Sequence, residues 1–207
     1  MTFYEPYSES HVNFLYNLLF CDDIALFKNE ETVNAEGVWS ILLTDNADIA
    51  ALRKIAEAET NAGRVRALAY NRLRGSGDNV PPKVLLGVIL EVPLDQGLDV
   101  LAAFAEGGVR YLNQSGKAAI FEGPGNPVEA LAKELLAVSQ PIVNQIGPWD
   151  KQRLPPPQRN VRMTFVVSDG LYFGEGPFEA LQNDQLAGPV LAKATELMQR
   201  VVELGVQ

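Results

Sequence analysis

Three arginines and three glutamates stand at repeated positions and are the residues whose types and spacing could do chemistry. Each arginine follows a valine at the opening of a predicted hairpin, and each glutamate begins a Glu-x-Pro motif that closes one. In an antiparallel hairpin the start of the first strand lies beside the end of the second, so each arginine is the predicted cross-strand neighbour of a glutamate. In chain order the pairs are Arg66 with Glu91, Arg110 with Glu122, and Arg162 with Glu175.

These six residues are candidate ligand-binding residues, and three interpretations stay open. They could be ion pairs at one rim of the sheet, each worth about 0–1 kcal/mol if exposed. The three arginines could instead gather and cradle an anionic ligand. The glutamates could do acid–base work if their surroundings separated their pKa values. The sequence favours ion pairs, because every arginine has a glutamate to neutralise it.

A second candidate region is the loop at residues 147–160, which is locally basic and rich in proline. It carries Trp149, Lys151, Arg153 and Arg159 around three consecutive prolines, a composition that neither a helix nor a central strand accepts. Long loops in compact proteins are often functional. We expect this loop either to dock a partner or cover the open face of the sheet, or to be a rigid surface connection.

The motifs of common enzyme classes are absent from the sequence. His11 is the only histidine and Cys21 the only cysteine, so one chain can form neither a disulfide nor a metal site with several histidines. Acidic neighbours of Cys21 oppose a reactive thiolate. No phosphate-binding glycine loop or nucleophile motif occurs. We therefore assign no catalytic residue, no metal and no cofactor.

The composition limits which classes of partner and which cellular compartment we expect. Hydrophobic residues make up 47% of the 207 residues, which is typical of a globular protein, and the formal net charge of -9 disfavours binding to nucleic acid. The N-terminus lacks the pattern of a signal peptide, and no apolar run approaches the roughly 20 residues that span a bilayer. We expect a cytoplasmic protein with no membrane partner.

The periodicity of apolar residues predicts alternating helices and hairpins. Turn-forming glycines and prolines separate the elements. Helices are predicted at 8–19, 45–62, 94–106, 128–142 and 186–204; a strand at 38–43; and hairpins at 64–73 with 83–92, 109–113 with 117–122, and 161–168 with 171–173.

This order predicts an α+β protein whose antiparallel sheet carries helices mainly on one face. The sheet would be built from repeated ββα units or from duplicated ferredoxin-like βαββα units. We expect a single compact domain over residues 1–207, with an N-terminal helical extension at 1–37 and pseudo-repeat halves at 38–113 and 114–207. A homodimer is a corollary, because an uncovered sheet face needs a partner.

The expected function is therefore broad. The missing motifs favour a non-enzymatic module that binds a small ligand or assembles with another protein. The alternative is a small-molecule enzyme that uses the glutamates and arginines at the sheet rim or in a cleft between repeats.

Overall fold

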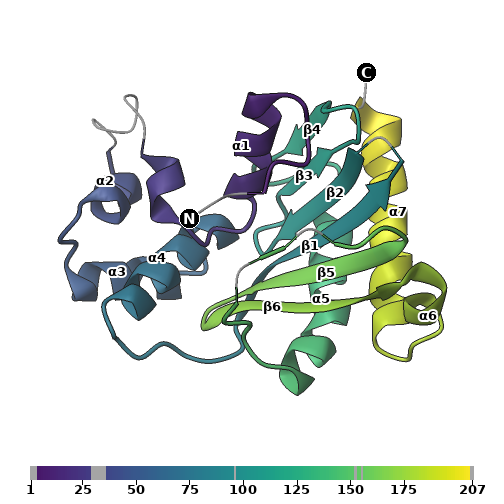
Figure 1. Cartoon of the computed structure of the whole chain (residues 1–207). Helices are drawn as coiled ribbons and strands as arrows, with labels where there is room; N and C mark the ends of the chain where they lie inside the picture. The colour runs from purple at the N-terminus through teal and green to yellow at the C-terminus, as the bar shows by residue number, and fades with distance from the viewer. Residues whose placement is uncertain (1–3, 29–35, 96, 152, 155, 206–207) are drawn as a thin grey trace.

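The computed structural model describes residues 4–28, 36–95, 97–151, 153–154 and 156–205. Within these residues six antiparallel strands form one sheet in the order β4-β3-β2-β1-β5-β6 (Figure 1). The strands are β1 (Leu85–Leu94), β2 (Gly97–Phe104), β3 (Val109–Leu112), β4 (Ala118–Phe121), β5 (Asn160–Val167) and β6 (Gly170–Pro177). The helices are α1 (Ser10–Leu18), α2 (Val38–Leu43), α3 (Ile49–Glu57), α4 (Gly63–Gly75), α5 (Glu129–Gln145), α6 (Phe178–Gln182) and α7 (Ala187–Gly205), with a 3-10 turn, η1 (Ile24–Phe27).

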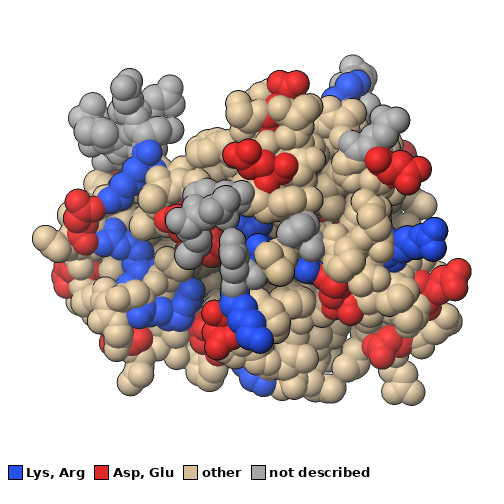
Figure 2. All heavy atoms as spheres, in the orientation of Figure 1, with Lys and Arg blue, Asp and Glu red and all other residues tan. Residues whose placement is uncertain are grey.

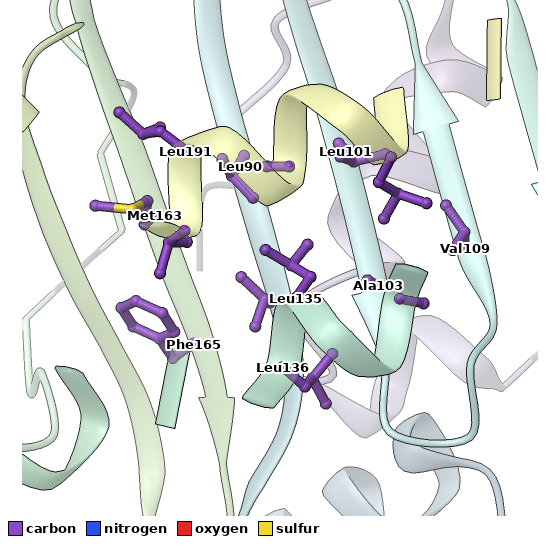
Figure 3. Packing of buried hydrophobic residues seen from close by; sticks show 14 of the residues in the cluster. Leu90, Leu101, Ala103, Val109, Leu135, Leu136, Met163, Phe165 and Leu191 are labelled. Carbon is purple, nitrogen blue, oxygen red and sulfur yellow. The ribbon is translucent and has the colours of Figure 1, made fainter. Parts of the chain in front are cut away.

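Two long amphipathic helices, α5 and α7, cover one face of the sheet. Leu135 of α5 and Leu191 of α7 pack against a row of sheet residues that includes Leu90, Leu101 and Phe165 (Figure 3). Burying one such side chain contributes about 1.5–3 kcal/mol. This layer forms one of two hydrophobic cores of similar size.

The N-terminal helices cover much of the opposite face. Tyr16 of α1 and Leu68 of α4 belong to a second core that also contains Leu86, Ile89 and Phe104 of β1 and β2. The prediction of helices mainly on one face is therefore wrong. The physical reason is that the central strands are apolar on both sides, so each side needs a covering layer.

Three predicted elements have the wrong type. Residues 64–73, predicted as a strand, lie in α4; residues 38–43, also predicted as a strand, form α2; and residues 94–106, predicted as a helix, contain β2. In β2 the residues from Leu98 to Phe104 are almost all buried, and a continuous apolar run has no period that separates a strand from a helix. In α4, Val65, Leu68 and Leu73 are buried on the inner side.

The remaining predicted elements are confirmed. They include α1, α3, α5 and α7, and the hairpins β3–β4 and β5–β6. The residues that the structure describes between Ile146 and Asn160 belong to no helix or strand, as predicted for this loop. Pro141 lies inside α5 without ending it. The ββα repeat is not confirmed, because Val65 and Arg66 lie in a helix rather than at the opening of a hairpin. No helix in the described part of the chain is long and apolar enough to cross a membrane.

Candidate functional site

A row of charged side chains crosses the sheet on the face opposite α5 and α7. The register pairs Glu91 of β1 with Arg162 of β5, and Arg162 with Glu175 of β6. The side chains therefore alternate in sign across three strands. The Arg162 guanidinium donates to Glu175 through Nε (2.8 Å) and Nη2, and its Nη1 donates to the backbone carbonyl of Leu154. Arg162 is 6% exposed, so this is a buried ion pair rather than a rim contact.

Glu91 is fully buried at the centre of this face. Its Oε1 accepts a 2.6 Å hydrogen bond from the Tyr16 hydroxyl, and its Oε2 accepts one from Thr164 Oγ1 at 3.4 Å. Burial raises the pKa of this carboxyl, because desolvation disfavours the charged form; the Tyr16 hydrogen bond and the Arg162 charge oppose the shift. The same burial, together with the nearby carboxylate, raises the pKa of Tyr16.

Arg153 fastens the loop at residues 147–159 to α1. Its Nη1 donates to the Tyr16 hydroxyl (3.3 Å) and its Nη2 to Asn17 Oδ1 (3.0 Å). The guanidinium carbon lies 3.6 Å from the centre of the Phe20 ring, and Nε lies 3.7 Å from Asp22 Oδ2. A loop arginine thus connects the N-terminal helix with the C-terminal half of the chain.

A cavity of about 830 Å³ lies between the loop and the β5–β6 hairpin. Arg162, Thr164 and Phe173 line it from the sheet. Trp149 lines it from the loop, and its ring meets that of Phe173 edge-on at 4.6 Å between ring centres. Asp22 lines it from the segment after α1. The volume is within the range of small-molecule sites.

Two polar atoms at this cavity are buried without a hydrogen-bond partner among the described residues. They are Asp22 Oδ1, an acceptor, and Arg153 Nε, a donor. Burial raises the pKa of Asp22, and the charge of Arg153 opposes that shift. Buried polar groups are rarely left unpaired, because each costs about 1–3 kcal/mol. The two side chains are each other's neighbours, since Arg153 Nε lies 3.7 Å from Asp22 Oδ2.

The cavity is more basic than the protein as a whole. Four of its lining residues are basic and three are acidic, whereas the whole chain carries 17 basic and 26 acidic residues. Figure 2 shows Lys and Arg side chains gathered at the left and centre of this face, over α3 and α4. The charged lining residues are Arg74, Lys151, Arg153 and Arg162, with Asp22, Asp150 and Asp169.

The structure brings only some of the candidate residues together. Trp149, Lys151, Arg153 and Arg162 line the cavity, and Lys151 Nζ lies 5.3 Å from the centre of the Trp149 ring. Arg159 is exposed and lies outside the cavity, beside a shallow hollow at the β1–β2 turn.

The predicted Arg–Glu pairs have different outcomes. Arg162 contacts Glu175, and Arg110 contacts Glu122, as the hairpin register predicts. The pairing of Arg66 with Glu91 is wrong. Arg66 lies in α4, where its Nε donates to the Ala56 carbonyl (2.9 Å). The three arginines therefore do not gather at one rim.

Sequence reasoning missed several residues of this site. Thr164 carried a signal, because it and Arg162 alternate with apolar residues along β5 and so share one face. Tyr16 follows Val12 by four residues, which places both on the buried side of α1. Asp22 carried no signal in the sequence, since its position depends on how the segment after α1 packs.

The described residues contain no group of three or more histidine, cysteine or acidic side chains that could hold a metal ion. The charged and aromatic side chains that line the cavity can bind charged groups and flat apolar surface. In comparisons with known proteins, no family model matches the chain, and a search of curated proteins finds no significant similarity.

Proposed function

We propose that the protein binds a small molecule, with a flat apolar body and an acidic group, in the cavity between the loop and the β5–β6 hairpin. The observation that carries the proposal is the 830 Å³ cavity itself, whose wall combines the aromatic rings of Trp149 and Phe173 with the charged side chains of Lys151 and Arg153. Trp149 and Phe173 offer apolar surface to the body of the molecule, and Lys151 and Arg153 offer charge to its acidic group.

Binding without catalysis is the better-supported version. Two buried carboxyls have a raised pKa, Glu91 and Asp22. Asp22 lines the cavity but lies beside Arg153, whose charge favours its ionised form, and Glu91 does not line the cavity. Both oxygens of Glu91 already accept hydrogen bonds, from Tyr16 and Thr164. A general base must reach the proton that it abstracts, so Glu91 could act as one only by exchanging these partners, and Asp22 only by leaving its ion pair with Arg153.

Anilinonaphthalene sulfonate is a suitable first probe, because it is a flat aromatic anion that fluoresces in apolar sites. We expect saturable binding of one probe molecule per chain. Trp149→Ala should weaken binding about tenfold, because an aromatic wall contributes about 0.5–1.5 kcal/mol beyond the area it buries. Arg153→Gln should weaken it further, since it removes the charge.

Phe178→Ala is the matched control, because Phe178 is 44% exposed against 42% for Trp149 and lies outside the cavity. Equal losses in the Trp149 and Phe178 variants would show that the probe binds exposed aromatic side chains in general, and the proposal would fail. Native mass spectrometry of the purified protein adds a second readout, a retained small molecule lost from the Arg153 variant.

A further inference from the structure

A second hollow lies on the same sheet face, at the other end of the sheet, between α1 and the β3–β4 hairpin. Its volume is about 190 Å³. Arg64 of α4, Arg110 of β3 and Glu122 supply its charged groups. The rest of the lining is aliphatic, from the end of α1 and from β3 and β4: Leu15, Leu18, Leu19, Leu112 and Ile120.

The two arginines bring more positive charge into the hollow than its acid neutralises. Arg110 contacts Glu122, whose side chain is 58% exposed. Arg64 makes no ion pair with a described carboxylate; its guanidinium lies near the rings of Phe27 and Phe104 and interacts with the Cys21 thiol. Arg64 Nε and Arg110 Nη1 are both buried without an acceptor. The two guanidinium charges are therefore only partly neutralised by the one carboxylate of the hollow, Glu122.

The other charged groups nearby do not supply a second anion. Burial raises the pKa of the Cys21 thiol to about 11, which keeps it neutral beside Arg64. Glu106 acts on Arg110 through its charge, but its Oε2 accepts a hydrogen bond from the Gly63 amide at 2.6 Å and it does not line the hollow. Burial and the charge of Arg64 lower the pKa of Arg110 to about 10, so the two guanidinium groups repel each other.

We propose that this hollow binds a short-chain carboxylic acid, with the carboxylate between Arg64 and Arg110 and the alkyl chain against the leucines of α1. Planar guanidinium groups match a carboxylate in geometry and charge. The volume of about 190 Å³ lies below the roughly 300–1,000 Å³ of sites for drug-sized ligands, which favours a ligand as small as butyrate. The aliphatic lining favours a carboxylate with a tail over inorganic phosphate, which has no apolar part.

The test titrates the full chain with sodium butyrate, butyramide and inorganic phosphate. The readout is the shift of the arginine Nε–Hε resonances in nitrogen-15 NMR spectra. We expect saturable shifts of Arg64 and Arg110 with butyrate, and binding at least about tenfold weaker with butyramide, which lacks the charge that strengthens these hydrogen bonds.

Two substitutions move the affinity in opposite directions. Arg64→Gln should weaken butyrate binding about tenfold, because it removes the guanidinium that has no carboxylate partner. Glu122→Gln should tighten it, because it removes the one lining carboxylate that competes for Arg110. Arg200→Gln on the exposed side of α7 is the control and should change nothing.

Several results would overturn the proposal. Equal affinity for butyrate and butyramide would reduce the hollow to an apolar contact, and equal affinity for phosphate would remove the role of the alkyl chain. Unchanged binding in the Arg64 variant, with its fold verified by thermal unfolding, would place the anion elsewhere. The Glu122 variant keeps both arginines, so weaker binding there would also contradict the geometry.

Discussion

Replacing Tyr16 by phenylalanine tests how the buried Glu91 is stabilised. The substitution removes one hydroxyl from a fully buried ring and leaves the ring itself in its aromatic contacts. That hydroxyl donates the 2.6 Å bond to Glu91 Oε1 and accepts from Arg153 Nη1. Of the two hydrogen bonds that the Glu91 carboxyl accepts from described residues, the variant keeps the 3.4 Å bond from Thr164.

The expected loss depends on the charge of Glu91. A hydrogen bond to a charged group contributes about 1.5–3 kcal/mol, and a neutral one about 0.5–1.5 kcal/mol. At pH 8 we therefore expect Tyr16→Phe to lower the free energy of unfolding by about 2 kcal/mol. For a chain of this size that is about 4–8 °C in Tm.

The loss should grow as the pH rises, and the sign follows from linkage. The folded pKa of Glu91 lies above its ordinary value of 4.5, so the folded protein holds this proton more tightly than the unfolded chain. Stability from this group is therefore complete below about pH 4.5 and falls as the pH rises toward the folded pKa. Removing the Tyr16 hydroxyl raises the folded pKa of Glu91 further. The free energy of unfolding of the variant therefore falls more steeply as the pH rises. Near pH 4 the loss should be about 1 kcal/mol.

The assay is urea unfolding of the wild type and the variant at pH 4 and pH 8. Tyr111→Phe is the matched control, because Tyr111 donates to a carboxylate, Asp99 Oδ2, at 2.7 Å. Asp99 is only half-buried and also accepts from the Gln114 amide, so we expect a smaller loss there than for Tyr16→Phe at pH 8. The double variant with Glu91→Gln isolates the coupling between Tyr16 and Glu91.

Two outcomes would refute this reasoning. A loss that is the same at pH 4 and pH 8 would mean that Glu91 does not change its charge between them in the folded protein. A loss no larger than that of Tyr111→Phe would mean that burial gives the Tyr16 bond no added strength.

Three further predictions concern backbone packing and the buried thiol. Gly63→Ala should lower the free energy of unfolding by about 1–3 kcal/mol in urea, since the new methyl group would lie 2.5 Å from the Leu86 carbonyl oxygen. Gly75→Ala is the control: the space around Gly75 is open, so the substitution should leave the stability unchanged or raise it by up to about 1 kcal/mol. Pro141→Ala should raise Tm, with a gain of about 1–2 kcal/mol, because proline is unfavourable inside α5; an unchanged Tm would mean that α5 already accommodates it. Cys21, buried and with its thiol pKa raised to about 11, should react with a thiol reagent only on unfolding, and rapid native labelling would contradict its placement.

The hairpins show which contacts could be predicted from neighbouring residues in the sequence. Asp169 and Gly170 mark the β5–β6 turn, and the register that follows places Arg162 opposite Glu175. The same reasoning failed for Arg66, because its segment was assigned to a strand. Val65, Leu68 and Leu73 are compatible with one side of a helix, and alanine is the strongest helix former, so the sequence of α4 did carry the correct signal.

The cavity could not be predicted from the sequence, because its walls come from segments far apart in the chain. Asp22 and Arg153 meet only because α1 packs over the sheet and the loop crosses back to it. We expected an open sheet face, and a homodimer to cover it, because the sequence did not show that α1 and α4 pack against the central strands. The homodimer stays a prediction.

The sequence by itself determined the α+β class, the amphipathic helices α5 and α7, and the two C-terminal hairpins, because periodicity and turn residues act over a few neighbouring positions. Tertiary structure alone decided which charges are buried. The sequence predicts Glu91 and Arg162 at the rim of the sheet. Both are buried, because α1 and the loop cover that part of the sheet. Burial removes water from a charged group, and that desolvation depends on all the segments that surround it rather than on its own neighbours in sequence.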